Sequence, residues 1–135
     1  MPTLNLKVAP LQNPERYKQL ALALTNLTAE ILGKRPAVTA VFIEDLPAAQ
    51  WYVGGNPVQR PTAVLEISVT AGTNTPAEKE AFVKAAFEEL QRQLAHGGRL
   101  EDASYVIVRE LPASDWGYAG RTQQSRQQER ALAVA

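Results

Sequence analysis

The chain has 135 residues, which is enough for one domain with a hydrophobic core of its own. Basic and acidic residues number 14 each, so the formal net charge is zero, which does not favour nucleic acid or an anionic membrane as a partner. Cysteine is absent and His96 is the single histidine. This excludes disulfides and thiolate zinc sites, and it argues against a metal centre built from several histidines.

No apolar segment approaches the roughly 20 residues that a bilayer-spanning helix needs. The first residues also lack the basic and apolar regions of a signal peptide. We therefore expect a cytoplasmic protein that does not enter a membrane.

The first predicted element is a strand over residues 2–8, in which Leu4, Leu6 and Val8 form one apolar face. Pro2 stands at its head, directly after Met1, and aminopeptidases usually remove methionine before proline. The mature chain would then begin with a secondary amine. An α-amino group has a reference pKa of about 8, which apolar or cationic surroundings lower further. Pro2 is therefore a candidate general base, on the condition that Met1 is removed.

A helix is predicted next, and a second strand after it. Asn13 before Pro14 has the order of a helix cap and a first helical position, and Gly33 marks the end of this helix. Between these limits, apolar residues recur at three- and four-residue spacing: Tyr17, Leu20, Leu24, Leu27 and Ile31. The apolar run at residues 41–43 indicates the second strand.

The next segment contains a motif that occurs twice. Residues 46–51 (LPAAQW) recur as residues 111–116 (LPASDW), each copy following an apolar run and an acidic residue. Both copies are followed by glycine at the same distance, Gly55 and Gly120. Each copy predicts a short hairpin.

The elements before the second motif also match the first half. Residues 65–69 alternate as a strand, and Thr75 before Pro76 predicts a second capped helix. The chain therefore consists of two predicted pseudo-repeats, at about 2–55 and 63–120, each a strand, a helix, a strand and a hairpin.

A helical crossover makes the two strands of each repeat parallel neighbours. Side by side, the repeats predict an α/β sandwich in which one four-stranded sheet carries both helices on one face. We expect residues 1–121 to form this single domain. The uncovered face of the sheet predicts self-association. The Gln/Arg-rich tail, residues 122–135, is expected to be either disordered or packed on a neighbouring subunit.

These features resemble the tautomerase superfamily, which is typified by 4-oxalocrotonate tautomerase. The resemblance covers about residues 2–121, and its most specific parts are Pro2, the capped helix starts and the two hairpin motifs. It implies a catalytic amino-terminal proline and no metal or organic cofactor. Two fused units are similar to the long members of the family, which are typically trimers. The second unit begins near Ala63 without a proline, so the resemblance implies one site per chain in a homotrimer.

The resemblance also implies site residues besides Pro2. Trp116 falls where short members place an aromatic pocket residue. Tyr105 falls where short members place a substrate-binding arginine and the migration-inhibitory-factor type places a tyrosine. Lys34 lies in a stretch similar to one whose lysine meets the substrate carboxylate. Arg109 and Arg121 flank the second hairpin and are further candidate carboxylate ligands. Each has a plainer structural interpretation as well, so the sequence leaves open which cation binds the carboxylate.

Some positions of the chain lack residues that the family carries, and this reduces the number of reactions that the resemblance allows. Gln12 and Asn74 occupy the positions of the arginine that short members carry before the helix, and residues 69–74 lack the arginine pair of the dehalogenases and the decarboxylase. Proton transfer requires fewer catalytic groups than dehalogenation or decarboxylation, because it does not depend on this arginine pair. We therefore predict a tautomerase (isomerase) that catalyses keto–enol or 1,3-/1,5-proton transfer in small enolisable 2-oxo or 2-hydroxydienoic acids, with Pro2 as general base. The alternatives are a dehalogenase-, hydratase- or decarboxylase-type enzyme acting through Pro2, or a non-catalytic oligomeric binding protein.

Overall fold

The first half of the chain forms a β-α-β unit because an amphipathic helix connects two neighbouring parallel strands. In the computed structural model, which describes residues 2–134, Thr3 pairs with Ala40 and Val8 with Asp45. The elements of this half are β1 (Thr3–Ala9), α1 (Pro14–Leu32), the 3-10 turn η1 (Pro36–Val38), β2 (Ala40–Asp45), the 3-10 turn η2 (Ala48–Gln50), β3 (Tyr52–Val53) and β4 (Asn56–Pro57).

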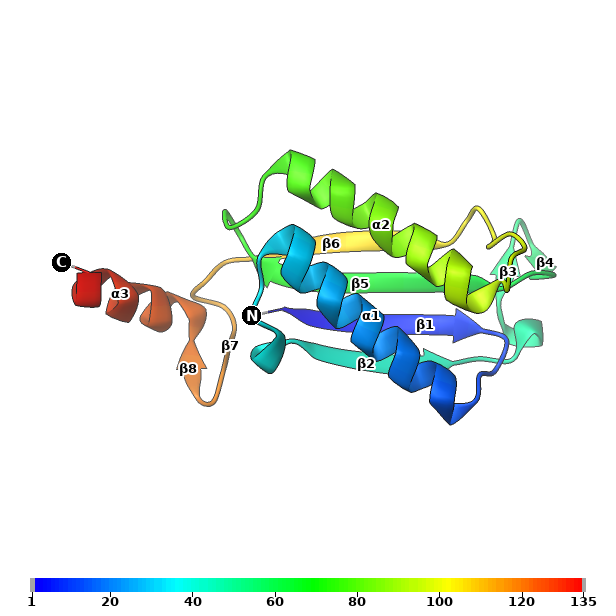
Figure 1. Cartoon of the computed structure of the whole chain (residues 1–135), viewed down its shortest axis with the longest axis horizontal. Coiled ribbons are helices and arrows are strands. Elements are labelled where there is room, and N and C mark those ends of the chain that lie inside the picture. The colour runs from blue at the N-terminus through cyan, green and yellow to red at the C-terminus, as the bar shows by residue number, and fades with distance from the viewer. Residues whose placement is uncertain (1, 135) are drawn as a thin grey trace.

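The second half repeats this order and adds one helix. Its elements are β5 (Thr62–Thr70), α2 (Pro76–Leu94), β6 (Tyr105–Leu111), β7 (Gly117–Tyr118), β8 (Arg121–Thr122) and α3 (Gln123–Val134). β5 is parallel to β6 and antiparallel to β1, so the sheet order is β2-β1-β5-β6. Helices α1 and α2 cover the same face of this sheet (Figure 1). The predicted α/β sandwich of two tandem β-α-β units is confirmed.

Local signals determine where both long helices begin. The Asn13 side chain accepts a hydrogen bond from the Arg16 amide (2.9 Å), and Pro14 occupies the first turn of α1. At α2, Thr75 and Glu78 form a reciprocal capping box. At the end of α1, Gly33 adopts a left-handed conformation (φ 69°), which residues with a Cβ rarely adopt.

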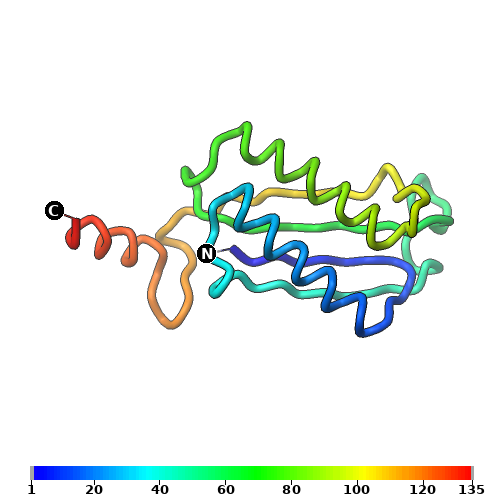
Figure 2. The backbone as a smooth tube through the Cα atoms, viewed as in Figure 1, coloured from blue at the N-terminus to red at the C-terminus, as the bar shows by residue number. Residues whose placement is uncertain are grey.

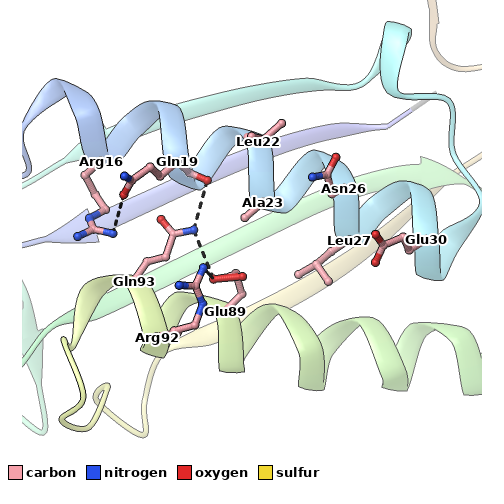
Figure 3. A pocket seen from close by; sticks show the side chains of 10 residues that line it. All are labelled: Arg16, Gln19, Leu22, Ala23, Asn26, Leu27, Glu30, Glu89, Arg92 and Gln93. Carbon is pink, nitrogen blue, oxygen red and sulfur yellow. Dashed lines mark hydrogen bonds and ion pairs between the residues drawn. The ribbon is translucent and has the colours of Figure 1, made fainter.

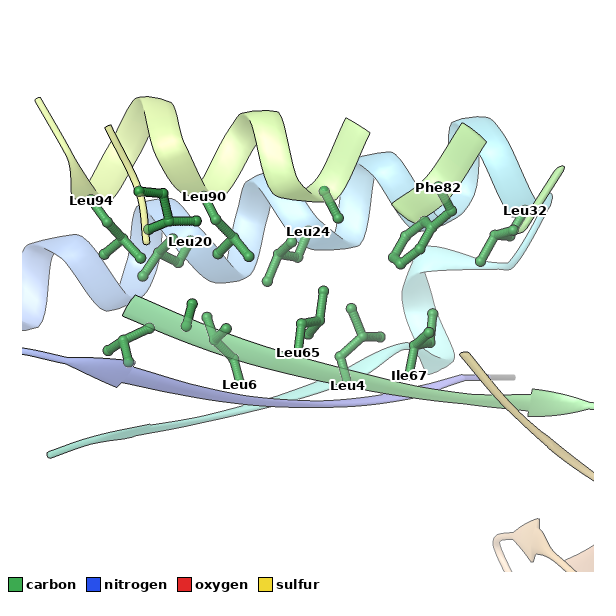
Figure 4. Packing of buried hydrophobic residues seen from close by; sticks show 14 of the residues in the cluster. Leu4, Leu6, Leu20, Leu24, Leu32, Leu65, Ile67, Phe82, Leu90 and Leu94 are labelled. Carbon is green, nitrogen blue, oxygen red and sulfur yellow. The ribbon is translucent and has the colours of Figure 1, made fainter. Parts of the chain in front are cut away.

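The core lies between the helical layer and the sheet (Figure 4). Leu4, Leu6, Leu65 and Ile67 point from the central strands toward the helices, and all four are fully buried. The largest buried side chain, Phe82, comes from α2. Alternate residues of β1 and β5 therefore face the helices, and the residues between them face the other side of the sheet.

That other face carries several large exposed side chains. Phe42 on β2 is 56% exposed, and Tyr105 and Ile107 on β6 are 63% and 37% exposed. Their neighbours Val41, Ile43, Val106 and Val108 pack on the core, so the three residues project away from the helices. We call this surface the open sheet face.

The carboxy-terminal segment leaves the sheet after the β7–β8 hairpin. Residues 123–134 form α3, which extends beyond the end of the sheet (Figure 1). Figure 2 shows the start of β1 on the same side of the molecule as this hairpin and α3. The packing of the tail on a neighbouring subunit stays a prediction. None of the helices within residues 2–134 is long and apolar enough to cross a membrane.

Candidate functional site

Pro2 lies where the starts of β1 and β2 meet the end of β5. Its carbonyl accepts a hydrogen bond from the Ala40 amide (3.2 Å), and the register that pairs Thr3 with Ser68 brings Thr70 back to this end of β1. Pro2 is buried and has the same alternation as Leu4, so its ring faces the helical layer. Met1, whose removal we expect, lies outside the described residues.

A cavity of about 280 Å³ lies at this end of the sheet. It is lined by Gly33, Lys34, Arg35, Val38, Thr70, Thr73, Tyr118, Gln123, Gln127 and Arg130. Three of these side chains are cationic, and no acidic residue is among the lining residues that the structure describes. We call it the basic cavity. Its positive potential favours an anionic ligand.

Lys34 enters the basic cavity because Gly33 turns the chain at the end of α1. Its Nζ donates a hydrogen bond to Thr73 Oγ1 (2.8 Å), on the loop that follows β5. Burial lowers the pKa of the Lys34 ammonium, and the negative charge of Glu78 partly opposes this shift. Lys34 is therefore a partly desolvated cation, which binds an anion more strongly than a solvated one does.

Lys34 also lies next to the position where the family arginine is missing. Asn74, at that position, follows Thr73 directly and donates to the Leu32 carbonyl (2.9 Å) at the end of α1. The two hydrogen bonds join the end of α1 to the loop after β5. Lys34 therefore brings a positive charge from the end of α1 to the loop after β5, where the arginine is missing.

Trp116 and Arg121 lie together in a second hollow. It has a volume of about 260 Å³ and is formed by the β7–β8 hairpin and the segment before it. The Trp116 indole nitrogen is buried without a hydrogen-bond partner in residues 2–134. Arg121 forms an ion pair with Glu129 and donates to Ser125 Oγ (3.3 Å), so its charge is already compensated by α3.

Tyr105 and Arg109 are not brought to Pro2 within one protomer. Both project from the open sheet face, whereas Pro2 faces the helical layer. Tyr105 begins β6 opposite Val64, at the far end of the sheet from Pro2. Arg109 lies in the row of Ser68 and Thr3, near the Pro2 end, where it pairs with Glu66 (3.5 Å). Neither side chain is among the residues that line the basic cavity of the same chain.

The sequence did not identify the residues that α3 contributes to the basic cavity. Gln123, Gln127 and Arg130 line it from the tail, which carries little apolar pattern. Gln123 and Gln127 have the helical i, i+4 spacing that places side chains on one face, and Arg130 follows three residues later. This spacing is the one sequence feature that groups the three residues, but only the fold shows that they lie at the Pro2 end of the sheet.

A larger hollow of about 500 Å³ lies between α1 and α2, on the face of the helices away from the sheet (Figure 3). Its lining carries two arginines and two glutamates, so it has no net charge. Arg92 pairs with Glu89 (2.6 Å), and Gln93 donates to the Gln19 carbonyl (3.2 Å), as the dashed lines in Figure 3 mark. Because these side chains already bind one another, the hollow has fewer free charged groups for a ligand than the basic cavity has.

Within the described part of the chain, no cluster of three His, Asp or Glu side chains is placed to hold a metal ion. The basic cavity offers Lys34, Arg35 and Arg130 to an anion, at the end of the sheet where Pro2 begins β1.

Comparisons with known proteins agree with this fold. Residues 2–60 match the family model described as tautomerase enzyme. A probable tautomerase of Dickeya dadantii (strain 3937) is 36% identical over 59 residues, which are 43% of this chain and 88% of that relative.

The similarity to solved structures spans both repeats. A fused 4-OT described as a wild-type symmetric trimer has a TM-score of 0.79 at 22% identity, covering 92% of this chain and 98% of the other. A member of the cis-3-chloroacrylic acid dehalogenase family has a TM-score of 0.76 at 18% identity, covering 98% and 92%. These likenesses show a shared fold. Because the sequence relative is matched over most of its length, and the family model covers the same amino-terminal unit, the chain belongs to the tautomerase family.

Proposed function

We propose that this protein is a cofactor-independent tautomerase that uses Pro2 as a general base. Its substrate is a small enolisable 2-oxo or 2-hydroxydienoic acid, in which it moves a proton between oxygen and carbon or between two carbons. The proposal requires a mature chain that begins with Pro2, because a proline acylated by methionine is an amide and has no basic lone pair.

The observation that carries the proposal is that Pro2 is buried at the end of the sheet where the basic cavity lies, although Pro2 itself is not among the residues that line the cavity. Burial and nearby positive charge both disfavour protonation of an amine. An amino terminus has a reference pKa of about 8, so even a modest lowering leaves much of it neutral at pH 7. Lys34 supplies a partly desolvated cation at this end of the sheet, and Arg35 and Arg130 add further positive potential.

The proposed reaction has two proton transfers. Neutral Pro2 first removes a proton from the α-carbon of the keto acid, or from the enol oxygen in the reverse direction. Negative charge then develops on the enolate oxygen, and the Lys34 ammonium or a neighbouring arginine stabilises it. The protonated Pro2 finally returns the proton to another atom of the same intermediate. No atom is gained or lost, as a tautomerisation requires.

We further propose a homotrimer in which neighbouring protomers complete the site. The exposed Phe42 and Ile107 on the open sheet face support this, because large apolar side chains left exposed on a sheet favour association. Tyr105 and Arg109 project from the same face and would reach the basic cavity of a neighbouring protomer. In the trimer, Trp116 forms an aromatic wall that limits water near Pro2. Hydration of an unsaturated acid also needs a base that activates water, and the described lining of the basic cavity contains no carboxylate.

The decisive comparison is between the wild type and Pro2→Ala, with phenylenolpyruvate and 2-hydroxymuconate as substrates. Intact mass is measured first, to establish that Met1 is absent from both proteins. Loss of a positioned general base lowers the rate by about 100-fold or more. Pro57→Ala, at an exposed hairpin proline, is the matched control and should retain wild-type rates. Equal turnover by the wild type and Pro2→Ala would refute the proposed base.

A further inference from the structure

We propose that helix α3 is a substrate-binding element: Gln123 and Arg130 bind a carboxylate of the substrate across the basic cavity from Lys34. This assignment rests on the proposed function for the identity of the ligand as a substrate. The anion-binding property itself depends only on the residues that line the cavity.

The basic cavity lies between two segments that are far apart in the sequence. Lys34 and Arg35 come from the end of α1, whereas Gln123, Gln127 and Arg130 come from α3. Arg130 has no acidic partner within residues 2–134, in contrast to Arg121, which pairs with Glu129 on the same helix. The charge of Arg130 is therefore available to a ligand in the cavity. A guanidinium and an ammonium on the same cavity suit a carboxylate, since both donate charge-assisted hydrogen bonds.

Gln123 provides an independent reason to expect a ligand. Its side chain is only 6% exposed, and its Nε2 is buried with no hydrogen-bond partner in the described part of the chain. Burying an amide donor without a partner is unfavourable, and native proteins rarely leave such groups unpaired. Because Gln123 lines the basic cavity, a rotation of its side chain that turns Nε2 into the cavity would let a bound carboxylate oxygen accept this hydrogen bond.

The anion would be held by side chains of α3 and not by the amides at its first turn. The Gln123 amide donates to the Trp116 carbonyl (2.9 Å), and the Gln124 amide donates to the Ala113 carbonyl (2.8 Å). The Ser125 amide donates to Thr122 Oγ1 (3.0 Å). These backbone donors are already used, so the specificity lies in the residues that face the cavity.

Two residue pairs hold α3 in place beside the hairpin. The Arg126 guanidinium lies 3.9 Å from the centre of the Tyr118 ring and donates to the Tyr118 carbonyl (2.9 Å). The ion pair between Arg121 and Glu129 joins β8 to the same helix. Substitutions at Gln123 and Arg130 leave these contacts intact, so their effect on binding can be separated from an effect on the position of α3.

The test uses adipate, an unreactive six-carbon dicarboxylate, in calorimetric titrations of the full chain. We expect Gln123→Met and Arg130→Gln each to weaken adipate binding by about tenfold, as expected when a charge-assisted hydrogen bond is lost. Arg130→Lys, which keeps the charge, should recover part of the affinity. Arg99→Gln is the control, because Arg99 is an exposed arginine that pairs with Asp102 in the loop after α2.

Thermal unfolding distinguishes ligand binding from a structural role. Gln123→Met removes a buried unpaired donor, so the midpoint of unfolding without ligand should stay the same or rise. A stabilising structural role for Gln123 predicts a fall. In turnover of 2-hydroxymuconate, both variants should raise KM about tenfold with little change in kcat, the pattern of an interaction made equally with substrate and transition state.

The outcomes separate this assignment from the proposed function. The assignment of α3 would be overturned if both variants kept the wild-type adipate affinity and KM. It would also be overturned if the wild type did not bind adipate. Neither result would contradict the proposed role of Pro2. Adipate binding that depends on Gln123 and Arg130, in a protein that turns over neither substrate, would support the anion site and refute the tautomerase proposal.

Discussion

The hydroxyl of Tyr17 donates a hydrogen bond to the carboxylate of Asp45, which joins the first turns of α1 to the end of β2. Lys79 and Glu110 make the equivalent connection between α2 and β6 in the second half. Tyr17 and Lys79 both lie four residues after the helix cap, and both acids precede a Leu-Pro pair. The two repeats thus share a side-chain link with different chemistry, hydroxyl to carboxylate in one and ammonium to carboxylate in the other.

The Tyr17–Asp45 link should make stability depend on pH. Hydrogen bonds from Tyr17 and from the Gln12 amide (2.7 Å) lower the pKa of Asp45 below its ordinary value of 3.8. A carboxyl whose pKa is lower in the folded state stabilises that state above the ordinary value, and the contribution is lost as the pH falls through the folded-state pKa. Asp45→Asn should therefore be less stable than the wild type at pH 7, and the difference should shrink below about pH 4.

Urea unfolding at several pH values measures this effect. Glu44→Gln, at the exposed residue next to Asp45 on the other side of β2, is the matched control. A pH-independent difference between Asp45→Asn and the wild type would show that the substitution acts through packing and not through ionisation.

Lys34 should contribute to catalysis as a charge. Replacing it with methionine keeps the length and removes the ammonium, so kcat/KM for 2-hydroxymuconate should fall by about 10- to 100-fold. Because burial lowers the pKa of Lys34 from its ordinary value of 10.5, the wild-type rate should fall as the pH rises through that lowered value. In Lys34→Arg the guanidinium stays charged, so this alkaline fall should move to higher pH.

Initial rates from pH 6 to pH 10.5 test this. Lys84→Met, on the exposed side of α2, controls for a general change in charge. Should Lys34→Met and Lys84→Met give the same kcat/KM, Lys34 would have no place in the site.

The two tryptophans allow a comparison between equivalent positions. Each carbonyl accepts a hydrogen bond at the same point of its hairpin, Trp51 from the Val58 amide and Trp116 from the Gln123 amide, both at 2.9 Å. If Trp116 forms the proposed aromatic wall, Trp116→Ala should lower kcat/KM by about tenfold, because water would then reach Pro2 more easily and raise the pKa of its amine. Trp51→Ala should keep the wild-type activity. If only Trp51→Ala impaired turnover, the pocket would belong to the first repeat.

The open sheet face predicts the assembly. Native mass spectrometry of the wild type should give a species of three times the 14.7 kDa protomer. Introducing charge in Phe42→Glu and Ile107→Glu should dissociate it, because a carboxylate is costly to bury in an apolar interface. Leu22→Glu, at a 64%-exposed leucine on the helical layer, should leave the assembly intact. Dissociation by Leu22→Glu alone would place the interface on the helices.

Apolar spacing predicted most of the core but not all of it. Phe82, Ala86, Leu90 and Leu94 recur at the four-residue spacing of one helix face on α2, and all are buried. In α1 the fully buried positions include Thr28, which the apolar stripe omitted. Its hydroxyl donates to the Leu24 carbonyl (2.7 Å), which compensates for the loss of water around a polar group. A pattern of apolar residues cannot identify such a position.

The sequence by itself determined the two β-α-β units, the starts of their helices and the place of Pro2 at the head of β1. These features depend on residues close together in the chain, because caps and alternating or helical periods are local. Only the tertiary structure decided which cations line the basic cavity at the Pro2 end of the sheet. Antiparallel pairing of β1 with β5 brings Thr70 and Thr73 to Lys34, and the hairpin brings Arg130 to the same cavity, whereas Tyr105 and Arg109 project from the opposite face. Contacts between distant segments produce no periodic signal in a single sequence, so the composition of the basic cavity becomes apparent only once the two halves are packed together.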